Sequence, residues 1–131
     1  MAQLKGRGRF RPEEEEEKEI PNGIINASID EEVSIGTIYL SGKIDQSNVD
    51  EITAKAMEYI SNAEVRGIIF DMTEVTYISR AGLTMFSKMN LAAGEYEKSY
   101  QLTNLRADIA KVFQMMGYAA AFSITEKEEE I

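Results

Sequence analysis

One stretch of the chain, residues 67–83, constrains the fold more than any other. It begins with an apolar run at residues 67–72, continues through a short polar loop and reaches Ser79 at the start of a helical pattern. A run that is apolar at nearly every position is typical of a strand buried on both faces, which favours a parallel sheet flanked by helices. The stretch predicts a buried strand feeding a helix N-terminus, where exposed N–H groups and the positive dipole end can meet an anion or a partner.

Strand patterns occur before and after this stretch. Gly36 interrupts the second strand, where it predicts a turn or bulge. The residues after position 40 are expected to lead into a loop. Including the central run, we expect strands at residues 24–29, 33–40, 67–72, 100–103 and 121–125.

Apolar residues at helical spacing predict three helices, at residues 48–61, 79–93 and 106–116. Ser47 is expected to cap the first helix, with Asp50 completing a capping box. Two strands followed by alternating helices and strands indicate an α/β fold. We expect a mixed sheet of about five strands, with an antiparallel N-terminal strand pair and helices packed on it. Gly94 and Gly117 are expected to end the second and third helices.

The composition excludes several classes of function. The 131 residues, 44% of them hydrophobic, suit one domain with one core. The absence of Cys and His removes disulfides, zinc–thiolate sites, thiol nucleophiles and Ser-His triads. There is no clustered carboxylate arrangement for a metal and no Gly-rich phosphate loop. We therefore expect a protein that is not an enzyme and has no cofactor and no metal site.

The sequence also indicates where the protein is located and whether it binds nucleic acid. No apolar run approaches the ~20 residues that a membrane span needs. The N-terminus is basic but lacks the apolar segment of a secretory signal. We therefore expect a cytoplasmic protein without membrane insertion. The net charge of −9 disfavours non-specific binding of nucleic acid.

Charge is concentrated at the two ends of the chain. Residues 1–12 hold four cations (Lys5, Arg7, Arg9 and Arg11), residues 13–19 hold six glutamates and Lys18, and residues 1–22 together predict a disordered arm. The Arg-Gly-Arg-Phe piece of this arm either touches RNA or an acidic partner, or is a solvated tail that pairs with its own glutamates. Residues 23–125 form the predicted domain, and residues 126–131 an acidic tail.

Three blocks of sequence carry a family resemblance. They are Leu-Ser-Gly-Lys-Ile-Asp at residues 40–45, the central stretch at 68–83, and residues 105–118 with their Val-Phe and Met-Gly pairs. In this order the blocks resemble STAS domains, the fold of bacterial anti-sigma factor antagonists, over residues 24–125. The resemblance implies a STAS-like fold and a role in binding rather than catalysis. It also implies that the partner is an anti-sigma factor with a serine-kinase domain. In the family, this partner is released when the acceptor serine is phosphorylated.

The chain departs from the family pattern at the signature. In STAS antagonists the signature reads Asp-Ser-(Ser/Thr)-Gly-Leu, and its serine is the phosphoacceptor. By the resemblance, an arginine stands here at the acceptor position and a serine at the Asp position. The family's final helix would also be short or missing, because the sequence ends at Ile131. The five matching residues are Ser79, Arg80, Ala81, Gly82 and Leu83.

Ser79 and Arg80 each allow more than one interpretation. Ser79 is either an N-cap, worth ~1 kcal/mol, or a displaced phosphoacceptor beside Arg80. A cation in the first turn of a helix opposes the dipole by about 0.3–1 kcal/mol. Arg80 is therefore expected to pair with Asp45 or to serve as an exposed anchor for a partner, unless it is an ordinary surface arginine. Asp71 either caps the loop after the strand or binds a ligand.

The expected contact surface comprises residues 77–90 and the loop around Asp45. Gly82 implies close approach, either of the helix to the sheet or of a partner to the helix. Met85 and Met89, expected on another helix face than Leu83 and Phe86, either contact a partner or belong to the core. The partner-binding candidates are Asp45, Tyr77, Ser79, Arg80, Ala81, Gly82, Leu83, Met85, Phe86 and Met89.

Two other functions fit the same fold. STAS-like subunits also serve membrane transport complexes by binding an ATPase in the cytosol, and some relatives are proposed to bind nucleotides at the helix N-terminus. The sequence does not separate these from the anti-sigma partner, and it leaves a homodimer open.

Overall fold

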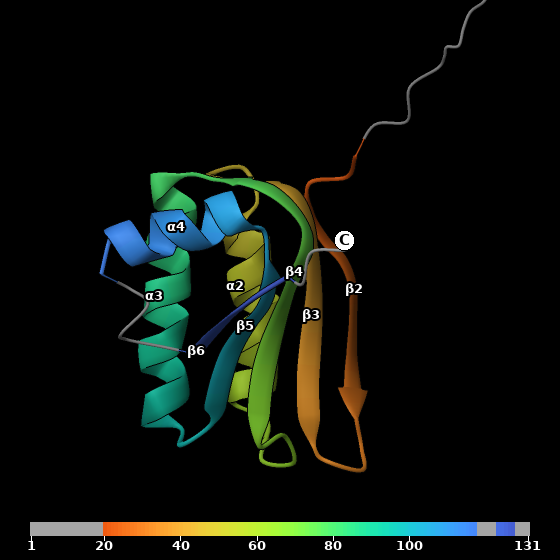
Figure 1. Ribbon diagram of the computed structural model, residues 1–131. Helices are drawn as coiled ribbons and strands as arrows, with labels where there is room; N and C mark the ends of the chain where they lie inside the picture. The colour runs from red at the N-terminus through yellow and green to blue at the C-terminus, as the bar shows by residue number, and fades with distance from the viewer. Residues whose placement is uncertain (1–19, 118–122, 128–131) are drawn as a thin grey trace, which may run out of the picture.

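The computed structural model describes residues 20–117 and 123–127. In this part of the chain, five strands form one mixed sheet and three helices pack on it (Figure 1). The elements, in chain order, are β2 (Gly23–Asp30), β3 (Ile35–Ile44), α2 (Val49–Ile60), β4 (Gly67–Ile78), α3 (Arg80–Glu95), β5 (Ser99–Leu105), α4 (Ala107–Met115) and β6 (Ser123–Glu126).

The strands lie side by side in the order β2-β3-β4-β5-β6. β2 pairs antiparallel with β3, and the remaining pairs are parallel. The predicted α/β fold, with its antiparallel N-terminal strand pair, is confirmed. Because β3 and β4 are parallel, their C-terminal ends lie at the same edge of the sheet, where Ile44 pairs with Ile78.

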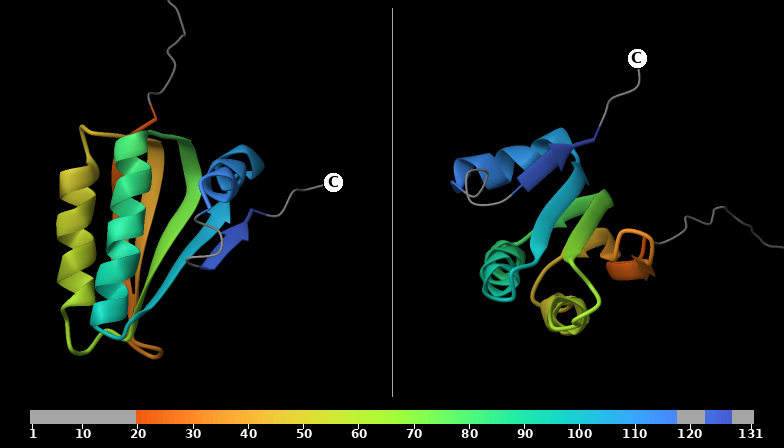
Figure 2. Two further views of the ribbon diagram at one scale, coloured as in Figure 1. Left: turned by 90° about the vertical axis from the view of Figure 1, so that its left-hand side faces the viewer. Right: turned by 90° about the horizontal axis from the view of Figure 1, so that it is seen from below.

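The helices cover one face of the sheet. Figure 2 shows α2 and α3 next to each other against that face. An aromatic cluster connects the layers: the Phe70 ring of β4 lies 5.2 Å from that of Phe86 on α3, and Phe113 of α4 lies 5.9 Å from Phe86. Tyr100 of β5 donates its hydroxyl to the backbone oxygen of Phe86 at 2.7 Å. Such edge-on aromatic pairs add about 0.5–1.5 kcal/mol each beyond their buried area.

The prediction that the central strand is buried on both faces is wrong. Ile68, Phe70 and Met72 of β4 are buried, whereas Ile69 and Asp71 between them are half-buried. Within the described residues the strand therefore has the alternation of a sheet covered on one side. Ile69 made the sequence look continuously apolar.

β4 is also longer than expected. The predicted polar loop at residues 73–78 is strand, paired with β3 as far as Ile44 and Ile78. The pairing shifts register twice, between Tyr39 and Ser41 and between Gly42 and Lys43 of β3. Each irregularity offsets the in-out alternation, so the spacing of the buried residues no longer has a period of two.

The expected turn or bulge at Gly36 is wrong as well. Gly36 lies in a regular part of β3, paired with Ile29 and Ile68. A Cβ atom at this position would lie 2.4 Å from Cδ2 of Tyr59 on α2. The glycine is thus required because the Tyr59 ring packs directly on the strand.

The helix ends are partly as expected. Gly117 follows α4 with φ +78° and donates its N–H to Gln114, which confirms it as the stop. Gly94, however, lies inside α3. The helix ends where Glu97 takes a left-handed φ of +60°, and the N–H groups of Glu97 and Lys98 bond to the oxygens of Gly94 and Ala93. These two bonds form a Schellman motif without glycine.

Most of the predicted tails lie outside the described residues, which exclude 1–19 and 128–131. Ala121 and Phe122 of the last predicted strand also lie outside them. Asn22, at the end of the predicted arm, is described, and its side-chain oxygen accepts a 2.8 Å hydrogen bond from the Lys43 N–H.

Candidate functional site

The site is built where β3 and β4 end together. The chain leaves β3 into the loop at residues 45–48 and leaves β4 directly into α3. The N–H of Ser79 donates a 2.9 Å hydrogen bond to the oxygen of Ile44, which holds the two exits side by side. The family-like blocks at residues 40–45 and 68–83 are thereby brought together at one edge of the sheet.

Hydrogen bonds within the loop hold Asp45 in place. One carboxylate oxygen of Asp45 accepts from the Ser47 hydroxyl at 2.6 Å and from the Ser47 N–H at 2.9 Å. The hydroxyl bond, then the N–H bond and the nearby Lys43 charge, lower the pKa of Asp45 below its usual 3.8, although desolvation opposes them. Asp45 is therefore ionised at neutral pH.

Ser47 does not cap α2, contrary to expectation, because its hydroxyl is bound to Asp45. Asn48 is the N-cap residue instead, and it is buried. Its side chain bonds backward rather than into the helix: the oxygen accepts from the Asp45 N–H at 3.0 Å and the nitrogen donates to the Lys43 oxygen at 2.9 Å. These bonds fix the shape of the loop next to α3.

Ser79 is the N-cap of α3. Its backbone is extended, and its hydroxyl oxygen accepts from the Gly82 N–H at 3.2 Å. The structural interpretation of Ser79 is thus confirmed, while its role as a phosphoacceptor stays a prediction. The side chain is half-buried.

Gly82 allows the first turn of α3 to approach the sheet. A Cβ atom there would lie 2.8 Å from Cγ2 of Ile78 and 3.0 Å from the backbone oxygen of Ile44. Of the two explanations for this glycine, the close packing of helix on sheet is correct. Gly82 itself is buried.

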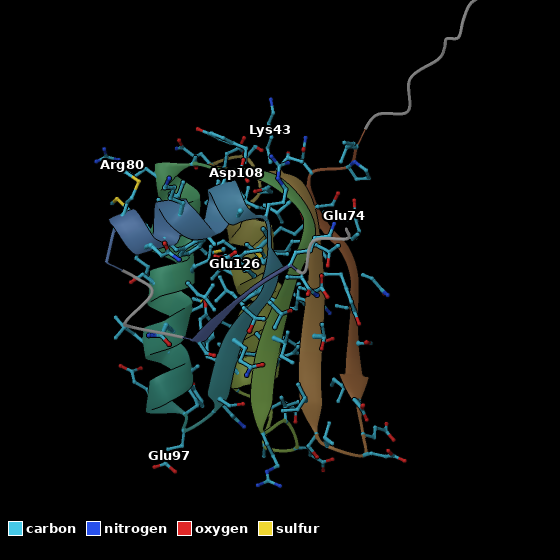
Figure 3. The ribbon with its side chains drawn as sticks, in the orientation of Figure 1. Lys43, Glu74, Arg80, Glu97, Asp108 and Glu126 are labelled. Atoms are coloured by element: carbon cyan, nitrogen blue, oxygen red, sulfur yellow. The ribbon has the colours of Figure 1, made fainter. Side chains whose placement is uncertain are left out.

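Arg80 is the first residue of α3 and is exposed. Figure 3 shows it extending outward from the end of the helix. Among the described residues no ion pair joins it to Asp45, so the expected Asp45–Arg80 pair is wrong; that carboxylate is held by Ser47. Both residues nevertheless line one shallow depression, together with Ser79 and Ala81.

The ten partner-binding candidates divide into two groups. Tyr77 and Arg80 are exposed, and Asp45, Ser79 and Ala81 are half-buried, so all five can reach a partner. The other five are buried: Gly82, Leu83, Met85, Phe86 and Met89. Of the two explanations for Met85 and Met89, a place in the core is confirmed, since both are buried together with Leu83 and Phe86. All four belong to the buried side of α3.

A groove between α2 and α3 was not foreseen. Asp50 and Thr53 line it on the α2 side, and Arg80, Thr84 and Lys88 on the α3 side. Met85 and Met89, only 4% and 6% exposed, also line it. The exposed residues Arg80, Thr84 and Lys88 recur at every fourth position, and this spacing was the one signal in the sequence that could have found the groove.

Asp71, which was expected to cap a loop or bind a ligand, makes local hydrogen bonds. One of its oxygens accepts from the N–H and hydroxyl of Thr73, at 3.0 and 2.6 Å, and the other from the side-chain amide of Asn104 at 3.3 Å. No group of three or more acidic side chains could hold a metal ion in the described ranges. No helix there is long and apolar enough to cross a membrane.

Comparison with known proteins gives two sequence findings. A family model described as the STAS domain matches residues 26–131. BtrV of Bordetella bronchiseptica, named as a candidate anti-sigma factor antagonist, is 22% identical over 90 residues, which cover 69% of this chain and 77% of BtrV.

Solved structures share the fold. SpoIIAA, an anti-sigma factor antagonist, superposes in its unphosphorylated form with a TM-score of 0.63 at 18% identity, covering 79% of this chain and 88% of SpoIIAA. The phosphorylated form from Bacillus gives 0.61 at 20% identity, with 76% and 88% covered. An anti-sigma factor antagonist of Mycobacterium paratuberculosis gives 0.66 at 11% identity, with 82% and 86% covered.

Proposed function

This chain belongs to the STAS domain family, and from that membership we propose that it is an anti-sigma factor antagonist. It binds an anti-sigma factor of the serine-kinase type and so releases a sigma factor for transcription. The relatives named above support this role, because BtrV, SpoIIAA and the mycobacterial protein all carry that description.

The observation that carries the proposal is the edge formed by the exits of β3 and β4. It presents an ionised Asp45, an exposed Tyr77 and an exposed Arg80 on a rigid frame. The adjoining chain is held by hydrogen bonds from the Ser79 N–H to the Ile44 oxygen and from the Gly82 N–H to the Ser79 hydroxyl oxygen. A charged, pre-ordered surface with an aromatic residue suits recognition of another protein.

Arg80 bears on whether phosphorylation can regulate the binding. It occupies the position of the family's acceptor serine, and a guanidinium cannot be phosphorylated as a hydroxyl can. The adjacent hydroxyl, that of Ser79, is half-buried and serves as the helix cap, and the Ser47 hydroxyl in the same depression is bound to Asp45. We infer that binding is constitutive and that phosphorylation does not release the partner.

Mass spectrometry after incubation with ATP and a serine-kinase-type anti-sigma factor tests this inference. The expected result is no stoichiometric phosphate on the unaltered chain, whereas Arg80→Ser supplies a hydroxyl and gains one at position 80. Stoichiometric phosphate on Ser79 of the unaltered chain would establish a displaced switch and contradict constitutive binding.

A further inference from the structure

The groove between α2 and α3 has a shape in which another helix can pack. Two ridges of α3 follow it, each with side chains at every fourth position. The outer ridge is Arg80, Thr84 and Lys88, and all three are exposed. Met85 and Met89 belong to the inner ridge and are almost completely buried. Ridges of this spacing define the channel into which the side chains of a third helix can pack.

The two cations of the outer ridge have no carboxylate partner within the described part of the chain. Two other cations there do: Lys55 pairs with Glu58 at 3.3 Å and Arg106 with Asp108 at 2.8 Å. Arg80 moreover occupies the first turn of α3, where the helix dipole disfavours a positive charge. This position has a small free-energy cost for the free domain, and a carboxylate of a partner beside Arg80 would offset that cost.

The opposite rim of the groove carries the opposite charge. Asp50, in the first turn of α2, lines the groove across from α3 and is exposed. The groove thus has a cationic side and an acidic side, with Met85 and Met89 between them. Methionine side chains adapt to the shape of what is packed on them.

We propose that this groove holds one amphipathic helix of the partner, with carboxylates on the side that faces α3. The inference rests on the proposed function and names the segment of the anti-sigma factor that is recognised. Eight residues separate Arg80 from Lys88, a rise of about 12 Å along the helix. Two carboxylates seven or eight residues apart on the partner helix meet both cations, while its apolar stripe covers the floor of the groove, which Ala81 and the small exposed parts of Met85 and Met89 line.

Charge reversal tests the proposal. The probe is the purified serine-kinase-type anti-sigma factor from the same organism, and the full-length chain is titrated with it by calorimetry. We expect Arg80→Glu and Lys88→Glu each to weaken binding, and the double variant to weaken it at least tenfold. The matched control is Lys111→Glu on α4, an exposed lysine that does not line the groove. It should change Kd by less than twofold.

Carbodiimide cross-linking identifies the occupant. This reagent joins an amine to a carboxylate with no spacer, so a bond from Lys88 to an Asp or Glu in a helix of the partner is the expected product. A bond from Lys88 only to carboxylates outside helices would overturn the helical occupant. If the partner binds and the double variant keeps its affinity, the partner does not bind in the groove, and only the further inference is contradicted. If the unaltered chain does not bind the anti-sigma factor at all, the binding groove and the proposed function are both contradicted.

Discussion

Two residues near the start of α3 differ in what they do for the fold. Gly82 is required by it, since the helix rests on Ile78 and on the backbone of Ile44. Arg80, two positions earlier, is exposed and opposes the helix dipole. The first residue places the helix and the second is available to a partner. Substitutions at the two positions are therefore expected to separate stability from binding.

Gly82→Ala should destabilise the domain by about 1–2 kcal/mol, because overpacking against Ile78 and Ile44 outweighs the gain of ~1 kcal/mol in helix propensity. Gly94→Ala is the matched control on the same helix. A Cβ atom there meets nothing within 4 Å, so this variant should be neutral or more stable by up to about 1 kcal/mol. Urea unfolding measures both. Equal effects of the two substitutions would contradict the close approach at Gly82.

The Asp45 carboxylate should titrate below 3.8, because hydrogen bonds from Ser47 favour its charged form. A lowered pKa in the folded state contributes stability above the unfolded value and loses it as the pH falls through the folded pKa. Carboxyl NMR across acid pH gives the midpoint directly. Ser47→Ala should raise it toward 3.8. An unchanged midpoint in that variant would mean that the Ser47 hydroxyl bond is not the cause.

At the scale of elements, α3 depends on its two ends. At the N-terminus the Ser79 hydroxyl takes one of the free N–H groups, and at the C-terminus Glu97 accepts a left-handed conformation to close the Schellman motif. Both ends are fixed by local hydrogen bonds, whereas the tilt of the helix is set by Gly82 and the aromatic core. The charge of Arg80 at the N-terminal end is not needed for either of these contacts and is free to serve binding.

Ser79→Ala should lower the free energy of unfolding by ~1 kcal/mol, since the Gly82 N–H loses its partner. Ser79→Asp should keep stability within about 0.5 kcal/mol of the unaltered chain, because a carboxylate both caps the helix and favours its positive end. Thermal unfolding of the three proteins in one buffer is the measurement. A neutral Ser79→Ala would show that the cap is not a stabilising contact.

Arg80→Glu should act in opposite directions on stability and binding. Replacing a cation by an anion in the first turn should raise the free energy of unfolding by about 0.5–1.5 kcal/mol at low salt. The same change should weaken the anti-sigma factor complex. Lys88→Glu, in the middle of the helix, should weaken binding without the gain in stability. Loss of both stability and binding in Arg80→Glu would point to a structural role for the guanidinium.

The sequence predicted the type and order of all the described elements, and local packing decided where it failed. Apolar periodicity found the three helices, and two strands followed by alternating helices and strands predicted a mixed sheet with an antiparallel start. The far half of β4 was missed because two register shifts break its alternation. The end of α3 was misplaced because Glu97, not Gly94, turns the chain. The burial of Met85 and the groove beside it depend on the rotation of α3 against α2, which tertiary packing sets.

At the scale of the whole molecule, the sheet is covered on one face by its helices (Figures 1 and 2), and the proposed recognition surface lies at one edge of the sheet. Parallel β3 and β4 end at that edge, so segments from residues 45 and 79 meet there although they are far apart in the chain. The groove of α2 and α3 begins at the same edge, because Arg80 and Asp50 lie in the first turns of their helices. Edge and groove therefore adjoin, as the proposal of one surface for one partner requires.

Calorimetric titration with the serine-kinase-type anti-sigma factor, before and after prolonged incubation with ATP, tests the central claim most directly. We expect saturable binding, with one chain bound at each site of the anti-sigma factor and the same Kd in both titrations. A complex that is lost after incubation with ATP, or no heat of binding in either titration, would contradict the proposal that this STAS domain binds its partner constitutively.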